Sequence, residues 1–112
     1  MVSDTAHMLQ IRGWDDASDQ KATIIMSDEE SALDLRDSVH KVNCPVLVLG
    51  SWVGWDSLKT EAAVEARYRQ QWSPAKQLTI VFSAHGKHFL MYDDFDWMIG
   101  EMDKFLTKTK ID

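Results

Sequence analysis

Two histidines in the second half of the chain are the best placed for acid–base chemistry. His85 and His88 follow directly after Leu78–Phe82, an apolar run typical of a buried β-strand. Loops at the carboxyl ends of parallel strands are where open α/β sheets place their sites. Because the unperturbed pKa of histidine lies near neutrality, His88 in such a loop could act as a general base. The pair could in principle share a metal ion, but zinc sites take three or four ligands, so we expect no metal and no cofactor.

The sequence offers no nucleophile to accompany this base. A serine held on a sharp turn between strand and helix has the pattern G-x-S-x-G, which does not occur in the chain. Ser51 and Ser83 lie near strand ends without that spacing of glycines. Cys44 is interpreted as a buried residue, because no basic neighbour would lower the pKa of its thiol. Asp56 follows the first tryptophan-rich stretch, and capping a helix is its expected role.

The second half of the chain alternates between strand and helix patterns. Val46–Leu49 and Leu78–Phe82 are continuous apolar runs, which predict strands buried on both faces of a parallel sheet. Residues 57–72 lie between them and are expected to form a helix capped by Asp56 or Ser57. Short connections between strand, helix and strand predict a β-α-β unit of the α/β class.

Residues 95–106 have the clearest helical pattern in the chain, and Asp94 is the expected N-cap. Apolar residues recur there at helical spacing, which predicts that one face of this helix packs on the sheet as core. These residues are Phe95, Met98, Ile99, Met102, Phe105 and Leu106.

Residues 1–42 are predicted to be helical and broken. Gly13 is expected to interrupt a first helix, and the polar run at 15–19 supplies capping groups for a second. Ser27, with Glu30 three residues later, matches a capping box and predicts a fresh helical start.

Two tryptophans follow the first predicted strand. Trp52 and Trp55 flank Gly54, and two roles are open for them. They could line a pocket for an apolar acyl group, or they could pack against the first 42 residues.

The loop that carries His88 resembles the end of the α/β-hydrolase family. In that family a phrase like HF-x-M-x-D-x-P-x-W follows the last strand and contains the catalytic histidine. Residues 88–97 read HFLMYDDFDW, with Phe95 in place of the proline. Residues 43–50 read NCPVLVLG, which is similar to the start of the family's penultimate strand. The two phrases occur in the family's order, with a helix of suitable length between them.

The resemblance implies a partial α/β-hydrolase-like fold in a single unit. Residues 1–42 would be a helical cap-like segment, and residues 43–112 would be the C-terminal β-α-β-α part. His88 would hold the catalytic position and Phe89 would pack beneath it. The family's acid position is Val53 here, and Asp56 comes three residues later, so the resemblance makes Asp56 only a weak candidate for the acid that orients His88.

Two functions from different classes are therefore expected. In the first, the chain is a truncated C-terminal part of an ester or acyl hydrolase, inactive alone, whose partner is the missing N-terminal half and whose substrate is a small ester. The alternative is a non-catalytic protein that folds by forming a homodimer or by strand exchange, because two strands make a poor sheet by themselves.

Composition excludes several other classes. Twelve basic and eighteen acidic residues give a net charge of −6, which argues against binding to nucleic acid or to an anionic membrane surface. No apolar run approaches the roughly 20 residues that a membrane-spanning helix needs. A single cysteine cannot form an intrachain disulfide, and we expect a cytoplasmic protein.

Overall fold

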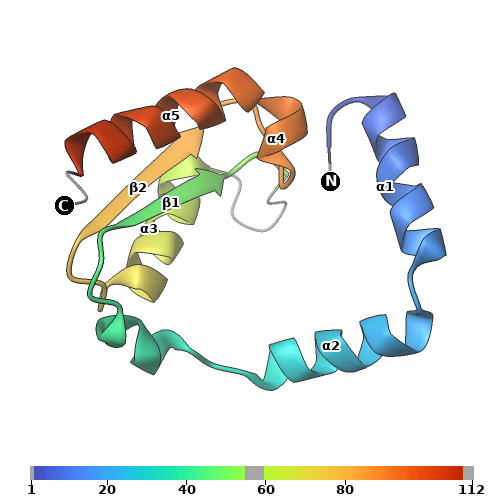
Figure 1. The fold of residues 1–112 in the computed structure, drawn as a ribbon, viewed down its shortest axis with the longest axis horizontal. Helices are drawn as coiled ribbons and strands as arrows, with labels where there is room; N and C mark the ends of the chain where they lie inside the picture. Colours follow the sequence, from blue (N-terminus) through green and yellow to red (C-terminus); the bar gives the residue numbers. More distant parts are fainter. Residues whose placement is uncertain (1, 55–59, 110–112) are drawn as a thin grey trace.

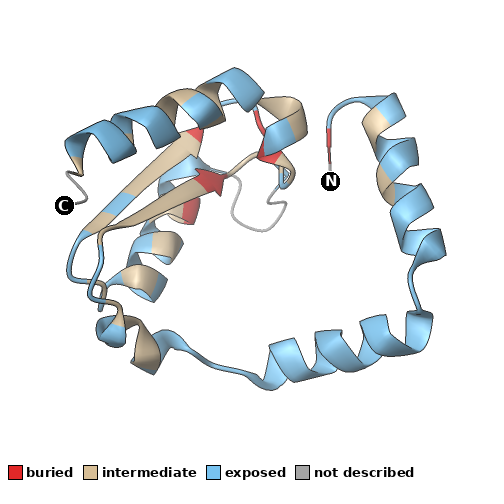
Figure 2. Ribbon diagram, viewed as in Figure 1, coloured by how far each residue is buried: buried red, intermediate tan, exposed pale blue. Residues whose placement is uncertain are grey.

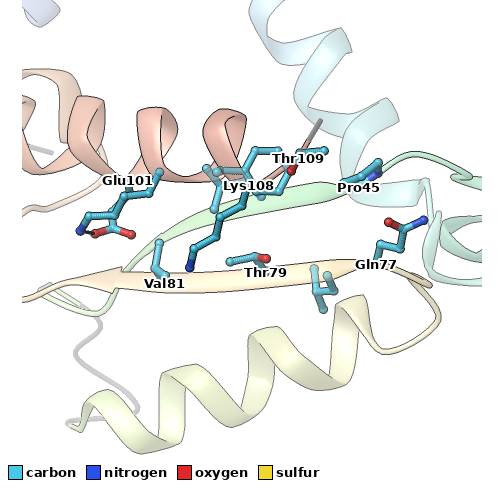
Figure 3. Close-up of a pocket in the computed structure, with 11 residues that line it drawn as sticks. Pro45, Gln77, Thr79, Val81, Glu101, Lys108 and Thr109 are labelled. Atoms are coloured by element: carbon cyan, nitrogen blue, oxygen red, sulfur yellow. Dashed lines mark hydrogen bonds and ion pairs between the residues drawn. The ribbon is translucent and has the colours of Figure 1, made fainter. Parts of the chain in front are cut away.

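A two-stranded parallel sheet lies at the centre of the fold. The computed structural model describes residues 2–54 and 60–109. Strands β1 (Val46–Ser51) and β2 (Leu78–Ser83) pair in parallel along their full lengths. Helix α3 (Glu61–Trp72) connects them and lies on one face, and α5 (Phe95–Lys108) lies on the other (Figures 1 and 3). The α/β class and the parallel strand pair predicted from the sequence are confirmed.

The face toward α3 holds the tightest packing. The Phe82 ring meets Tyr68 of α3 edge-on, with 5.2 Å between ring centroids. Gly50 is the register partner of Phe82, and a Cβ at that glycine would lie 2.5 Å from Phe82 Cε1. The Phe82 ring thus occupies the space that a side chain on the neighbouring strand would need. Val64 of α3 has no exposed surface, so it is the centre of this small core.

The face toward α5 is less well covered, and two predictions about it are wrong. No residue of α5 is buried, and Met102 is 40% exposed, so the Met98/Met102 stripe is not core. Likewise, residues 46–49 of β1 are only half-buried (Figure 2). Both errors have one cause. A sheet of two strands is too narrow to cover an apolar helix stripe, and it leaves its own strands partly open to solvent.

Residues 2–42 form an arm that curves away from the sheet and returns beside α4 (Leu90–Asp93) at its N-terminal end (Figure 1). It contains α1 (Thr5–Ala17), α2 (Gln20–Ala32) and the 3-10 helix η1 (Arg36–Lys41). None of these helices contains a buried residue, and the arm is almost entirely exposed in Figure 2. The radius of gyration is 16.2 Å, against about 13 Å for a compact chain of this length.

The predicted helix breaks in this arm are also wrong. Helix α1 continues through Gly13, and α2 continues through Ser27. A single glycine costs a helix only about 1 kcal/mol, which its neighbours can offset. The second helix begins after Asp19, which lies in the polar run expected to cap it, and the Asp19 carboxylate accepts a hydrogen bond from Ala22 N at 2.8 Å. A break does occur at Ser18, within the polar run that was expected to supply capping groups.

Two further local expectations are corrected, and a third is confirmed in position only. Helix α3 begins after Thr60, whose hydroxyl accepts a hydrogen bond from Ala63 N, and the expected caps Asp56 and Ser57 lie outside the described residues. Cys44 is exposed rather than buried, because it precedes β1 in an open connection. Asp94 occupies the N-cap position of α5 but makes no capping hydrogen bond. Across residues 2–54 and 60–109, no helix combines the length and apolar character needed to span a bilayer.

Candidate functional site

The loop of residues 84–89 lies at the carboxyl end of β2, where the sequence places His88. Ser83 ends the strand and has no exposed surface. Its hydroxyl accepts hydrogen bonds from His85 N at 3.1 Å and Gly86 N at 2.6 Å. It donates one to Asp94 Oδ2 at 2.6 Å. One buried hydroxyl therefore holds the first turn of the loop and ties it to the start of α5.

The middle of the loop is held from the other strand. Ser51 ends β1 and is the register partner of Ser83, so both serines lie side by side at the carboxyl ends of the two strands. The Ser51 hydroxyl donates to Gly86 O at 2.7 Å, and this contact is buried. A Cβ on Gly86 would lie 2.4 Å from Leu90 Cδ2 and 2.9 Å from Ser83 Oγ. Glycine is required here because no space remains for a side chain.

The residue before His88 is fixed by a second carboxylate. Asp93 Oδ2 accepts from Lys87 N at 3.0 Å, and Oδ1 accepts from Ser3 N at 2.8 Å. Burial alone would raise the pKa of Asp93, but the hydrogen bonds from Ser3 and Lys87, with the Lys87 charge, outweigh it and lower the pKa. Asp93 is therefore held as a carboxylate that links the loop to the start of the arm.

The arm contacts this region through its first residues. Val2 is 3% exposed, and the His7 ring stacks on Tyr92 of α4 (Leu90–Asp93) with 4.4 Å between centroids. The Nδ1 atom of His7 is shielded from solvent and has no hydrogen-bond partner in residues 2–54 and 60–109. The N-terminal segment thus packs against the short helix that follows the histidine loop (Figure 1).

His88 itself is presented to solvent. Its side chain makes no hydrogen bond or ion pair within the described parts of the chain, and its ring meets Phe89 edge-on at 5.0 Å. An exposed imidazole on a fixed loop can accept a proton from a group brought to it and return that proton. Asp56, the weak candidate for an orienting acid, lies outside the described residues.

The remaining candidates do not join His88. His85 is exposed, and no cluster of three or more potential metal ligands exists in residues 2–54 and 60–109. Trp52 is half-buried, and its indole N–H is shielded without a partner among the described residues. Trp55 lies outside them.

A hollow of about 420 Å³ lies at the other end of the sheet, between β2 and the last turns of α5 (Figure 3). Pro45 and Gln77 line the hollow, and each directly precedes a strand, so the hollow lies at the amino ends of the strands. His88 lies beyond the carboxyl end of β2. The side chains of Glu101 and Lys108 lie on α5 and face Val81 and Thr79 of β2 (Figure 3). The hollow therefore lies at the opposite end of the strands from the histidine loop and is not part of the histidine site.

Sequence reasoning missed the residues that hold the loop. These are Ser3, Ser51, Ser83, Gly86 and Asp93. A usable signal was present, because Ser83 directly follows the second predicted strand, Ser51 comes two residues after the first, and Ser83 precedes Gly86 by three residues. Only the register of the two strands shows that both serines serve the same loop.

Comparison of the chain with protein-family models, with curated protein sequences and with solved structures found no match. The resemblance to the α/β-hydrolase family therefore stays a prediction that rests on residues 43–50 and 88–97.

Proposed function

We propose that this chain is the C-terminal part of an α/β-hydrolase-like protein of the ester or acyl hydrolase type, and that it supplies the catalytic histidine, His88. The observation that carries the proposal is the combination of a fixed loop and a free imidazole. Hydrogen bonds with Ser51 and Ser83, which are buried, and with Asp93, which is partly buried, hold the backbone of Gly86 and Lys87 immediately before the histidine. A buried structural histidine has its ring nitrogens satisfied within the fold, whereas the exposed ring of His88 is open to a group on another part of the protein.

The chemistry would divide between two parts of one protein. A serine hydroxyl in the other part gives its proton to His88 as its oxygen attacks the ester carbonyl. The imidazolium then donates that proton to the departing alcohol as the C–O bond breaks. Water, deprotonated by His88, attacks the acyl group, and the proton returns to the serine. Nucleophile and oxyanion donors come from the other part, since this sequence has no G-x-S-x-G. The chain alone is therefore expected to be inactive.

Sequencing of the DNA upstream of the Met1 codon tests the first half of the proposal. An oxyanion-hole phrase and G-x-S-x-G, in frame or in a neighbouring gene, are expected there. Finding neither would overturn the proposal.

Co-expression of that segment with this chain tests the second half. Hydrolysis of a p-nitrophenyl ester should appear, and His88→Ala should abolish it. His85→Ala is the matched control, because His85 is an exposed histidine of the same loop and should be dispensable. Equal activity of the two variants would refute the assigned role of His88.

A second candidate function is supported by the exposed apolar surface. Both strands of the sheet have one unpaired edge, and unpaired edges invite pairing between chains. The arm also exposes Trp14, Ile24 and Met26, the last at 68%. In this alternative the chain is a non-catalytic protein that folds as a homodimer. Sedimentation equilibrium distinguishes the two: a dimer unaffected by His88→Ala and inert toward esters would favour it, and a stable monomer would exclude it.

A further inference from the structure

The hydrogen bonds of the Ser83 hydroxyl fix the loop after β2 and add nothing to the pairing of the strands. Ser83 Oγ has contacts with His85 N, Gly86 N and Asp94 Oδ2, all within 3.1 Å. None of these contacts joins β1 to β2 or closes a helix. A polar group buried in a small apolar fold is costly unless its partners serve a purpose. Two of its three hydrogen bonds go to the backbone that leads to His88, and the third goes to the carboxylate of Asp94.

We infer that Ser83 and Asp94 form a positioning pair for His88. The inference rests on the proposed function, because a positioning pair has a purpose only if His88 has one. Asp94 Oδ2 accepts a hydrogen bond from the Ser83 hydroxyl, which orients the oxygen lone pairs toward the two loop amides. The Gly86 amide is buried and would be unsatisfied without this contact. The loop therefore has one favoured conformation before any partner or substrate binds.

This assignment explains why Asp94 does not cap its own helix. Aspartate at an N-cap ordinarily accepts from the second or third backbone amide of the helix. Here its side chain makes no capping bond and turns to Ser83 instead. The helix forgoes a common stabilising contact, and the loop gains an anchor. Asp94 Cβ also lies 3.3 Å from where a Gly86 Cβ would stand, so the carboxylate closes one side of the turn.

Amide hydrogen exchange and heteronuclear NOE on the ¹⁵N-labelled chain test the inference. Asp94→Ala should raise exchange at Gly86 by about tenfold, the ratio that loss of one buried hydrogen bond gives, and should lower the NOE at His88. Asp94→Asn should restore both, because its amide oxygen still accepts from Ser83. Asp96→Ala is the matched control, since it changes an exposed carboxylate in the same first turn of α5.

Ser83→Ala should reproduce the Asp94→Ala effect. If it prevents folding, the Asp94 pair of variants decides alone. A uniform rise in exchange across β1, β2 and the loop would overturn the inference, because it would show a structural role only. An unchanged NOE at His88 in Asp94→Ala would overturn it as well. These readouts need no hydrolysis, so the inference can fail or stand separately from the co-expression assay with His88→Ala.

Discussion

Replacement of Gly86 by alanine gives the sharpest test of how the histidine loop is built. The added methyl would lie 2.4 Å from Leu90 Cδ2 and 2.9 Å from Ser83 Oγ. Leu90 is 8% exposed and Ser83 has no exposed surface, so neither can turn freely into solvent. The strain is steric, because Gly54 is the only glycine with positive φ among the described residues.

The magnitude follows from two contributions. Overpacking a filled site costs about 1–3 kcal/mol. Displacing Ser83 Oγ also weakens the 2.6 Å hydrogen bond from Gly86 N, and an unsatisfied buried amide costs about 1–3 kcal/mol. Because one movement can relieve part of both, we expect Gly86→Ala to lower the free energy of unfolding by about 2–4 kcal/mol.

Urea unfolding followed by tryptophan fluorescence measures this change. Gly100→Ala is the matched control, because a Cβ there meets nothing within 4 Å. In the interior of α5 that substitution should stabilise the protein by roughly 0.5–1 kcal/mol. If Gly86→Ala costs less than about 0.5 kcal/mol, the loop is not packed as described and the reasoning fails.

Three further predictions concern single side chains around the loop and before β1. The pKa of Asp93 is lowered on folding, so its contribution to stability is present above its unfolded pKa of 3.8 and is lost as pH falls through the lower folded value. Asp93→Asn should therefore remove part of the acid dependence of unfolding below pH 4. Urea titrations of both proteins from pH 5 to pH 2 measure this, and a free energy of unfolding that falls equally with pH in both would contradict the prediction. Ser51→Ala leaves the buried Gly86 carbonyl without its hydroxyl donor and should cost about 1–3 kcal/mol in urea unfolding, whereas a neutral result would show that the contact is dispensable. Cys44 is exposed, so Ellman's reagent should label it in the native chain nearly as fast as in urea, and strong protection would contradict the fold before β1.

The elements that carry local signals could be predicted from the sequence. Continuous apolar runs at 46–49 and 78–82 indicated both strands, and helical spacing from Phe95 indicated α5. Asp19 lay within the polar run that was expected to supply capping groups. The position of His88, in the loop after a strand, was equally a local property. These features depend on neighbours within a few residues, and so periodicity and capping chemistry contain them.

Burial could not be predicted in the same way. Apolar spacing in α5 shows which face seeks cover, but the exposure of Met102 depends on how wide a sheet the rest of the chain provides. The burial predicted for Cys44 failed for a related reason, because the residues next to it in the sequence do not show whether another element covers the segment before β1.

The loop anchors were decided by the tertiary structure alone. Ser51 and Gly86 are 35 residues apart, and only the parallel register of β1 and β2 brings a hydroxyl to that carbonyl. Asp94 has the sequence signal of a helix cap, yet its carboxylate accepts a hydrogen bond from the Ser83 hydroxyl instead of from the helix backbone. The sequence by itself determined that a histidine follows a strand. Which groups hold it depends on competition between hydrogen-bond partners that meet only when the sheet forms, because such bonds act over about 3 Å in space whatever the separation along the chain.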